Sequence, residues 1–153
     1  MKYDQQTRSA TVKAGMLRVC SDFTKLVASL GFRRTNSRSR AWAKCTDRLM
    51  HVIYFHRCGS TYGAPISNTV DIRVHFSFQN FDGSPASTGQ LTSEKVRDSR
   101  GYAYHLRFNA MSWSMYERCL EDLIRITKEH GLPWFQQHGA EPSAAPDMDS
   151  PIE

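Results

Sequence analysis

The chain begins with a long segment in which apolar residues recur at intervals of three and four. Between residues 9 and 30 these positions are Val12, Met16, Val19, Phe23, Leu26, Val27 and Leu30. Such spacing places them on one stripe of an α-helix. Gly31 follows directly, and glycine in the left-handed conformation commonly ends a helix. The pattern therefore predicts an amphipathic first helix over residues 9–30.

Apolar and polar residues then alternate with a period of two, which indicates β-strands. The alternation is clearest at residues 70–78, where Val70, Ile72, Val74, Phe76 and Phe78 are separated by Asp71, Arg73, His75 and Ser77. We expect further strands at 41–45, 50–57 and 102–108. Residues 82–100 are polar and contain glycine and proline, so we expect a long loop there.

A second helical stripe follows the strands, at Tyr116, Leu120, Leu123, Ile124 and Thr127. Gly131 and Pro133 are expected to end this helix. The order of elements predicts an α+β fold, in which a four-stranded antiparallel meander sheet has the N- and C-terminal helices packed on one face. Residues 1–138 would form a single domain, and residues 139–153, which have little apolar content, a flexible C-terminal tail.

Length and composition fit this interpretation. A chain of 153 residues suits one domain, and 40% hydrophobic residues is ordinary for a globular protein. The first residues lack the apolar stretch of a secretory signal, and no apolar run is long enough to cross a bilayer. We therefore expect a cytoplasmic protein without a membrane partner. The four cysteines are widely spaced, which favours free thiols over a zinc site.

Positive charge is concentrated in one segment of the chain. The formal net charge is +5, and no acidic residue lies between Phe23 and Thr46. The basic residues of this stretch are Lys25, Arg33, Arg34, Arg38, Arg40 and Lys44, with Trp42 among them. Guanidinium groups neutralise phosphates and carboxylates, and an aromatic ring can stack on a base. The segment is therefore a solvated turn, a site for an acidic protein or a site for nucleic acid.

The polar face of the predicted sheet is a second candidate site. Asp71, Arg73 and His75 share it by parity, and His105 and Arg107 would join them if the two strands pair with their apolar sides together. Histidine titrates near neutrality and arginine recognises anions. The face is therefore a solvated surface, a binding surface or a site of acid–base chemistry.

Metal and cofactor motifs are missing from the sequence. His51 and His56 are five residues apart, so they would face opposite sides of a strand. There is no zinc-ligand spacing, phosphate-binding loop or dinucleotide-binding fingerprint. We therefore expect no metal and no cofactor. The Trp134–Phe135 pair after the last helix would close the core or anchor a partner.

Three short motifs carry a resemblance to a known family. They are Leu30-Gly31-Phe32-Arg33, His105-Leu106-Arg107-Phe108 and Gly131-Leu132-Pro133-Trp134-Phe135. The pattern resembles the DUF4304-like family of small bacterial and phage-associated proteins of unknown function, over most of residues 10–138. The family has no established activity, so no catalytic residue follows from it. The resemblance implies an α+β fold and a setting in which accessory, immunity-type and counter-defence proteins occur.

We therefore expect a non-enzymatic protein that binds a macromolecule, as an inhibitor, immunity-type or counter-defence factor, with a protein target favoured over nucleic acid. The candidate binding residues are Arg33, Arg34, Arg38, Arg40, Trp42, Arg73, His75, His105 and Arg107. One alternative is nucleic-acid binding through residues 33–44, and another is a small hydrolase or transferase built on Asp71, His75 and His105. An open sheet face or edge strand would also allow a homodimer.

Overall fold

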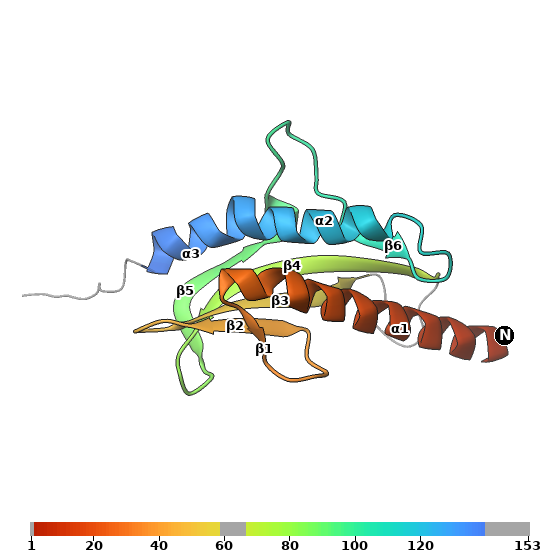
Figure 1. Ribbon diagram of the computed structural model, residues 1–153, viewed down its shortest axis with the longest axis horizontal. Coiled ribbons are helices and arrows are strands. Elements are labelled where there is room, and N and C mark those ends of the chain that lie inside the picture. Colours follow the sequence, from red (N-terminus) through yellow and green to blue (C-terminus); the bar gives the residue numbers. More distant parts are fainter. Residues whose placement is uncertain (1, 59–66, 140–153) are drawn as a thin grey trace, which may run out of the picture.

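The computed structural model describes residues 2–58 and 67–139, and it confirms an α+β fold with an antiparallel sheet (Figure 1). The helical elements are α1 (Lys2–Val27), the 3₁₀ turns η1 (Ala28–Leu30) and η2 (Ser93–Lys95), α2 (Tyr116–Ile126), the π-helical turn η3 (Thr127–Gly131) and α3 (Leu132–Gly139). The strands are β1 (Arg33–Arg34), β2 (Ala41–Cys45), β3 (Met50–Cys58), β4 (Thr69–Gln79), β5 (Pro85–Thr92) and β6 (Arg107–Asn109).

Within the described residues the sheet has six strands, so the prediction of four was wrong. Neighbouring strands follow the order β1-β2-β3-β4-β5, and β6 pairs with β4. Every pairing is antiparallel. β3 covers one edge of β4, while β6 pairs with residues 69–71 and β5 with residues 75–79 on the other edge. β4 is therefore the central strand, bonded along most of both edges.

Two strand predictions need correction. Residues 82–100 were expected to be a loop, but they contain β5 and η2. The strand expected at 102–108 is reduced to β6, because the backbone N–H groups of Tyr102 and His105 bond outside the sheet, to Asp98 Oδ1 at 2.9 Å and to Asp122 Oδ2 at 2.7 Å. The connection between η2 and β6 rises as a loop beside α2 (Figure 1).

The helix ends differ in how well the sequence predicts them. Gly31 has φ +93°, and its N–H bonds to the carbonyl of Ala28, so the first helix ends there as expected. Gly131 and Pro133 do not end the second helix, because η3 carries the chain directly into α3. Pro133 lies just after the π-helical turn inside this continuous helical run, so its missing N–H removes one helical hydrogen bond without ending the run. The described part of the predicted tail is Gly139, the last residue of α3, and residues 140–153 lie outside the described chain.

The core lies between the helices and the apolar face of the sheet. Phe23 of α1 contacts the rings of Trp42 and Phe55, at centroid distances of 4.8 and 4.7 Å. Phe135 of α3 contacts Phe76 of β4 at 5.9 Å. Phe135 is 2% exposed, so this part of the Trp134–Phe135 pair belongs to the core. No helix among the described residues has both the length and the apolar content to cross a membrane.

Candidate functional site

The strand register decides which arginines of the sheet face α1. Arg34 of β1 lies opposite Trp42, and Arg57 of β3 lies opposite Ile72. Trp42 and Ile72 are core residues, so Arg34 and Arg57 project from the face that the helices cover. Arg33 lies opposite Ala43 and therefore projects from the other face.

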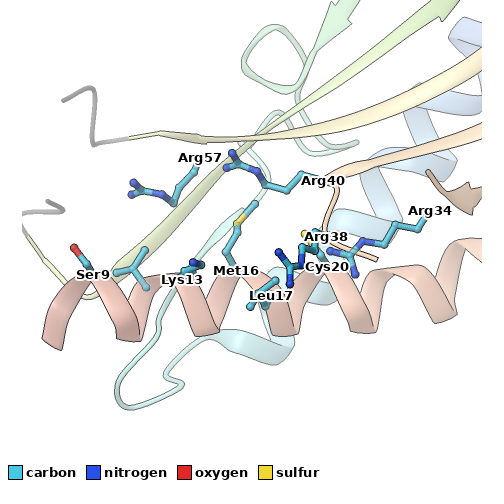
Figure 2. A pocket seen from close by; sticks show the side chains of 10 residues that line it. Ser9, Lys13, Met16, Leu17, Cys20, Arg34, Arg38, Arg40 and Arg57 are labelled. Carbon is cyan, nitrogen blue, oxygen red and sulfur yellow. The ribbon is translucent and has the colours of Figure 1, made fainter. Parts of the chain in front are cut away.

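Arg34 and Arg57 line a pocket of about 380 Å³ between α1 and the sheet, which we call the arginine pocket (Figure 2). Its residues are Arg34, Arg38, Arg40 and Arg57 from the strands and the turn, and Ser9, Val12, Lys13, Met16, Leu17 and Cys20 from α1. Figure 2 shows Arg40 and Arg57 on the side of this space opposite to α1. Among the described residues, five of the ten that line the pocket are cationic and none is acidic, so the pocket favours anions.

The turn between β1 and β2 is held by its own side chains. Asn36 Oδ1 accepts the backbone N–H of Arg38 at 2.8 Å, an arrangement typical of Asx turns. The hydroxyls of Thr35 and Ser39 are hydrogen-bonded at 2.7 Å. The N–H of Thr35 also donates to the carbonyl of Ala41, at 3.0 Å. These bonds hold the backbone that carries Arg38 and Arg40 at the mouth of the pocket.

The guanidinium group of Arg34 has one nitrogen held by a hydrogen bond and one buried nitrogen without a described partner. Its Nε donates a hydrogen bond of 2.7 Å to the carbonyl of Ser39, which orients the guanidinium group. Its Nη2 is buried and has no hydrogen-bond partner among the described residues. A buried donor without an acceptor is unfavourable, because it has lost its water and gained nothing in return. An anionic ligand in the pocket would supply the missing acceptor.

The α1 side of the pocket is mostly apolar, with Ser9 and Lys13 as its polar residues. Val12 and Met16 are buried, while Leu17 is 46% exposed beside the arginines. Cys20 is also buried, and burial raises the pKa of its thiol to about 11, although Arg34 and Arg40 act to lower it. At neutral pH Cys20 is therefore a protonated thiol, which is not the reactive form of cysteine. The pocket combines an apolar wall with a cationic one.

The open face of the sheet carries Arg73 and His75, but their polar groups are engaged locally. Arg73 forms an ion pair of 3.5 Å with Glu94. His75 Nδ1 is 3.3 Å from Gln90 Oε1, and its ring meets the ring of His56 at 6.1 Å. Burial lowers the pKa of His75. These side chains form an interacting polar surface at the middle of β4.

His105 and Arg107 line a shallow pocket of about 170 Å³ near Thr69, at the start of β4, that also contains Ser114. The backbone N–H of His105 donates to Asp122 Oδ2 at 2.7 Å. Burial and the nearby Arg107 lower the pKa of the His105 ring. Arg107 is opposite Asp71 in the sheet, so those two residues share a face as predicted.

The proposed combination of Asp71, His75 and His105 is not a compact group. Asp71 and His75 are four residues apart on β4, which corresponds to roughly 13 Å along a strand. His105 lies toward α2, where its backbone bonds to Asp122. Direct proton transfer needs hydrogen-bond distance, so these three residues do not form one proton relay in this structure.

The interpretation of Trp42 as a surface contact needs correction. Trp42 is 0% exposed and its Nε1 donates to Thr24 Oγ1 at 2.9 Å. It is a core residue and cannot stack on a partner. Sequence reasoning also missed Lys13 and Arg57, which line the pocket with Arg34, Arg38 and Arg40. The signal for Lys13 was its position directly after Val12 of the apolar stripe. The signal for Arg57 was a charged residue in a largely apolar strand.

All four cysteines are free thiols. Across residues 2–58 and 67–139, no three His, Cys, Asp or Glu side chains lie close enough together to hold a metal ion. The arginine pocket is therefore the most distinctive chemical feature of the described surface. Comparison of the chain with protein-family models, with curated proteins and with solved structures finds no match.

Proposed function

We propose that this protein is a non-enzymatic binding protein that recognises an acidic segment of a protein partner in the arginine pocket. The main support is the convergence of four guanidinium groups from β1, the following turn and β3, together with Lys13, in a pocket whose described lining holds no acidic residue. Like charges held together destabilise a fold unless an anion joins them. Arginine pairs with carboxylates through two parallel hydrogen bonds, and it is common among residues that dominate protein interfaces.

A protein partner is favoured over nucleic acid for two reasons. The apolar wall of the pocket, with Leu17 exposed, suits a peptide in which acidic and apolar side chains alternate. Trp42, the aromatic residue of segment 33–44, is buried and therefore offers no stacking platform for a base. The inhibitor or immunity-type role implied by the DUF4304-like resemblance would follow if the bound segment belongs to the working surface of an enzyme or toxin.

An affinity capture with matched variants tests this proposal. Tagged full-length protein is incubated with lysate of its own organism, with and without nuclease, and bound material is identified by mass spectrometry. The wild type is compared with an Arg34→Ala/Arg38→Ala/Arg40→Ala variant. Arg33→Ala is the control, because it removes the neighbouring charge from the opposite face. We expect a stoichiometric, nuclease-resistant protein that the triple variant loses and the control retains.

Other outcomes of the capture decide against the proposal. A partner that remains on the triple variant would bind elsewhere on the molecule. Material that disappears with nuclease would indicate nucleic acid, whose affinity should then fall log-linearly and steeply with salt concentration. Binding of a purified acidic partner should also weaken with salt, but with a shallower slope because fewer counterions are released.

A further inference from the structure

We infer that the anion taken by the arginine pocket is a phosphate monoester on an apolar or aromatic stem. This inference rests on the proposed function, because it concerns the same pocket and narrows the chemistry of what enters it. The phosphate would lie among Arg34, Arg38 and Arg40, and the stem would lie against Met16 and Leu17 of α1. The ester is either a phosphorylated side chain of a protein partner or a free small molecule of the same chemistry.

The number and direction of the donors favour phosphate over carboxylate. A carboxylate carries one negative charge, and a single guanidinium fork already occupies both of its oxygens, using two of its roughly four acceptor sites and balancing its whole charge. The pocket has four guanidinium groups and Lys13, which approach from separate segments of the chain. A phosphate monoester carries a charge of about −1.5 to −2 at pH 7 and three terminal oxygens. It can therefore accept hydrogen bonds from several arginines at the same time.

Arg34 is already oriented for this contact. Its Nε is held by the carbonyl of Ser39 at 2.7 Å, so little side-chain freedom remains to be lost when a ligand binds. Its buried Nη2 is the donor that has no partner among the described residues. A phosphate oxygen in the pocket would complete the hydrogen bonding of this group. Among the described lining arginines, Arg34 is the one that has a buried guanidinium nitrogen without a hydrogen-bond partner.

The opposite wall and the size of the pocket define the rest of the ligand. Val12, Met16 and Leu17 of α1 give the pocket an apolar surface. The volume of about 380 Å³ is near the lower end of the range for ligand pockets, which is roughly 300–1,000 Å³. This space suits a single ring or a short apolar chain together with one phosphate. Free inorganic phosphate would leave the apolar wall uncovered.

A graded ligand series tests the inference on the full-length protein. Isothermal titration calorimetry is carried out with phenyl phosphate, inorganic phosphate and benzoate, at equal ionic strength and pH 7.5. We expect phenyl phosphate to bind at least tenfold more tightly than either other probe, because it alone supplies both the phosphate and the stem. Lowering the pH to 5.5 should weaken its binding, since the second ionisation of a phosphate ester has a pKa of about 6.

Variants locate the binding. Arg34→Gln should weaken phenyl phosphate at least tenfold, whereas Arg33→Gln, on the opposite face, should leave its affinity unchanged. Leu17→Ser should weaken phenyl phosphate while the affinity for inorganic phosphate stays the same. Because Leu17 is 46% exposed, the Leu17→Ser variant is expected to fold, and circular dichroism checks all three variants. Equal loss in the Arg33 and Arg34 variants would overturn the inference.

The two sources of the ester are separated by a peptide. A short peptide with one phosphotyrosine should bind at least tenfold more tightly than phenyl phosphate if the ligand is a partner's side chain, and equally if it is a free small molecule. Benzoate binding as tightly as phenyl phosphate would overturn the inference while leaving the acidic-partner proposal standing. Phosphate-ester binding without any captured protein would support the inference and count against the proposed function.

Discussion

Trp42 Nε1 donates a hydrogen bond of 2.9 Å to Thr24 Oγ1, and this bond joins β2 to α1 inside the core. The Thr24 hydroxyl donates in turn to the carbonyl of Cys20 at 2.7 Å. The Trp42 ring also lies 4.5 Å from the ring of Phe55. Cys20 and Thr24 are one helical turn apart, so Trp42 holds the segment of α1 that forms one end of the arginine pocket.

Replacing Trp42 with Phe should destabilise the protein without altering anion binding. The change removes buried apolar surface and leaves a gap where the indole was, and it removes the donor to Thr24. Together these effects should lower the free energy of unfolding by roughly 2–3 kcal/mol. Urea unfolding at pH 7.5 measures the difference. An unchanged midpoint with impaired phenyl phosphate binding would instead make Trp42 a ligand contact.

Gly131→Ala should also destabilise the protein, although alanine in place of glycine normally stabilises a helix by about 1 kcal/mol. A Cβ atom at Gly131 would overlap the ring of Phe76 in the core. Overpacking of this kind typically costs about 1–3 kcal/mol. Gly139→Ala is the matched control, because its Cβ would lie 3.4 Å from Phe78, an ordinary contact.

A double variant gives the Gly131 prediction its sharpest test. Phe76→Leu alone should destabilise, since it removes part of a ring from the core. Combined with Gly131→Ala, it should lose less stability than the sum of the two single changes, because the smaller side chain leaves room for the new methyl group. Strict additivity in urea unfolding would show that the overlap with Phe76 is not the reason for the destabilisation.

The sequence predicts the central elements because their burial is one-sided. Alternate residues of β4 from Val70 to Phe78 are buried, and the period of two follows directly. β5 escapes prediction because it is a polar edge strand that includes Gly89 and begins at Pro85, with Leu91 only partly buried. Proline is tolerated at the first position of an edge strand, so the residue that suggested a loop is compatible with pairing.

The alternation of residues along the strands predicts part of the arginine pocket, namely which arginines face the helices. Arg34, Arg40 and Trp42 all project toward the helices, since Trp42 lies opposite Arg34 and Arg40 is two residues before it. Whether a residue on this face is packed in the core or lines the pocket depends on how α1 crosses the sheet. The alternation of apolar and polar residues along a strand does not show how a helix crosses it. Arg57 joins the group only through the register of β3 against β4, which depends on contacts far apart in the sequence.

Stability should fall as the pH drops from about 7 to 5, partly because of His51. This ring stacks on Phe135 at 4.6 Å, and burial and the nearby Lys44 lower its pKa below the ordinary 6.5. The unfolded state therefore binds the proton more readily than the folded state. Stability is complete above the unfolded pKa, and it decreases as the pH falls from there toward the folded pKa.

Urea unfolding of the wild type and His51→Phe at pH 7.5 and 5.5 measures this contribution. Phenylalanine keeps the aromatic packing and cannot take up a proton, so the variant should lose less stability on acidification. His75 and His105 also have lowered pKa values, and they should leave part of the pH dependence in place. A pH dependence identical in the wild type and the variant would rule out a contribution from His51.

Removing charge from the arginine pocket should stabilise the protein in the absence of ligand. An Arg38→Gln/Arg40→Gln variant relieves repulsion among the cationic groups that line the pocket. Because both residues are exposed, the free energy of unfolding should rise by only about 0.5–1 kcal/mol at low salt. Because 1 M salt shortens the screening length to about 3 Å, the gain should shrink there. Arg125→Gln is the control, since Arg125 Nη1 donates a hydrogen bond of 2.9 Å to the buried Asp122 and its removal should destabilise at either salt concentration. Equal destabilisation of both variants in urea would mean that the pocket arginines serve the fold. Stabilisation of the pocket variant alone, combined with loss of phenyl phosphate binding, would mean that the charges are kept together for a ligand at the expense of stability.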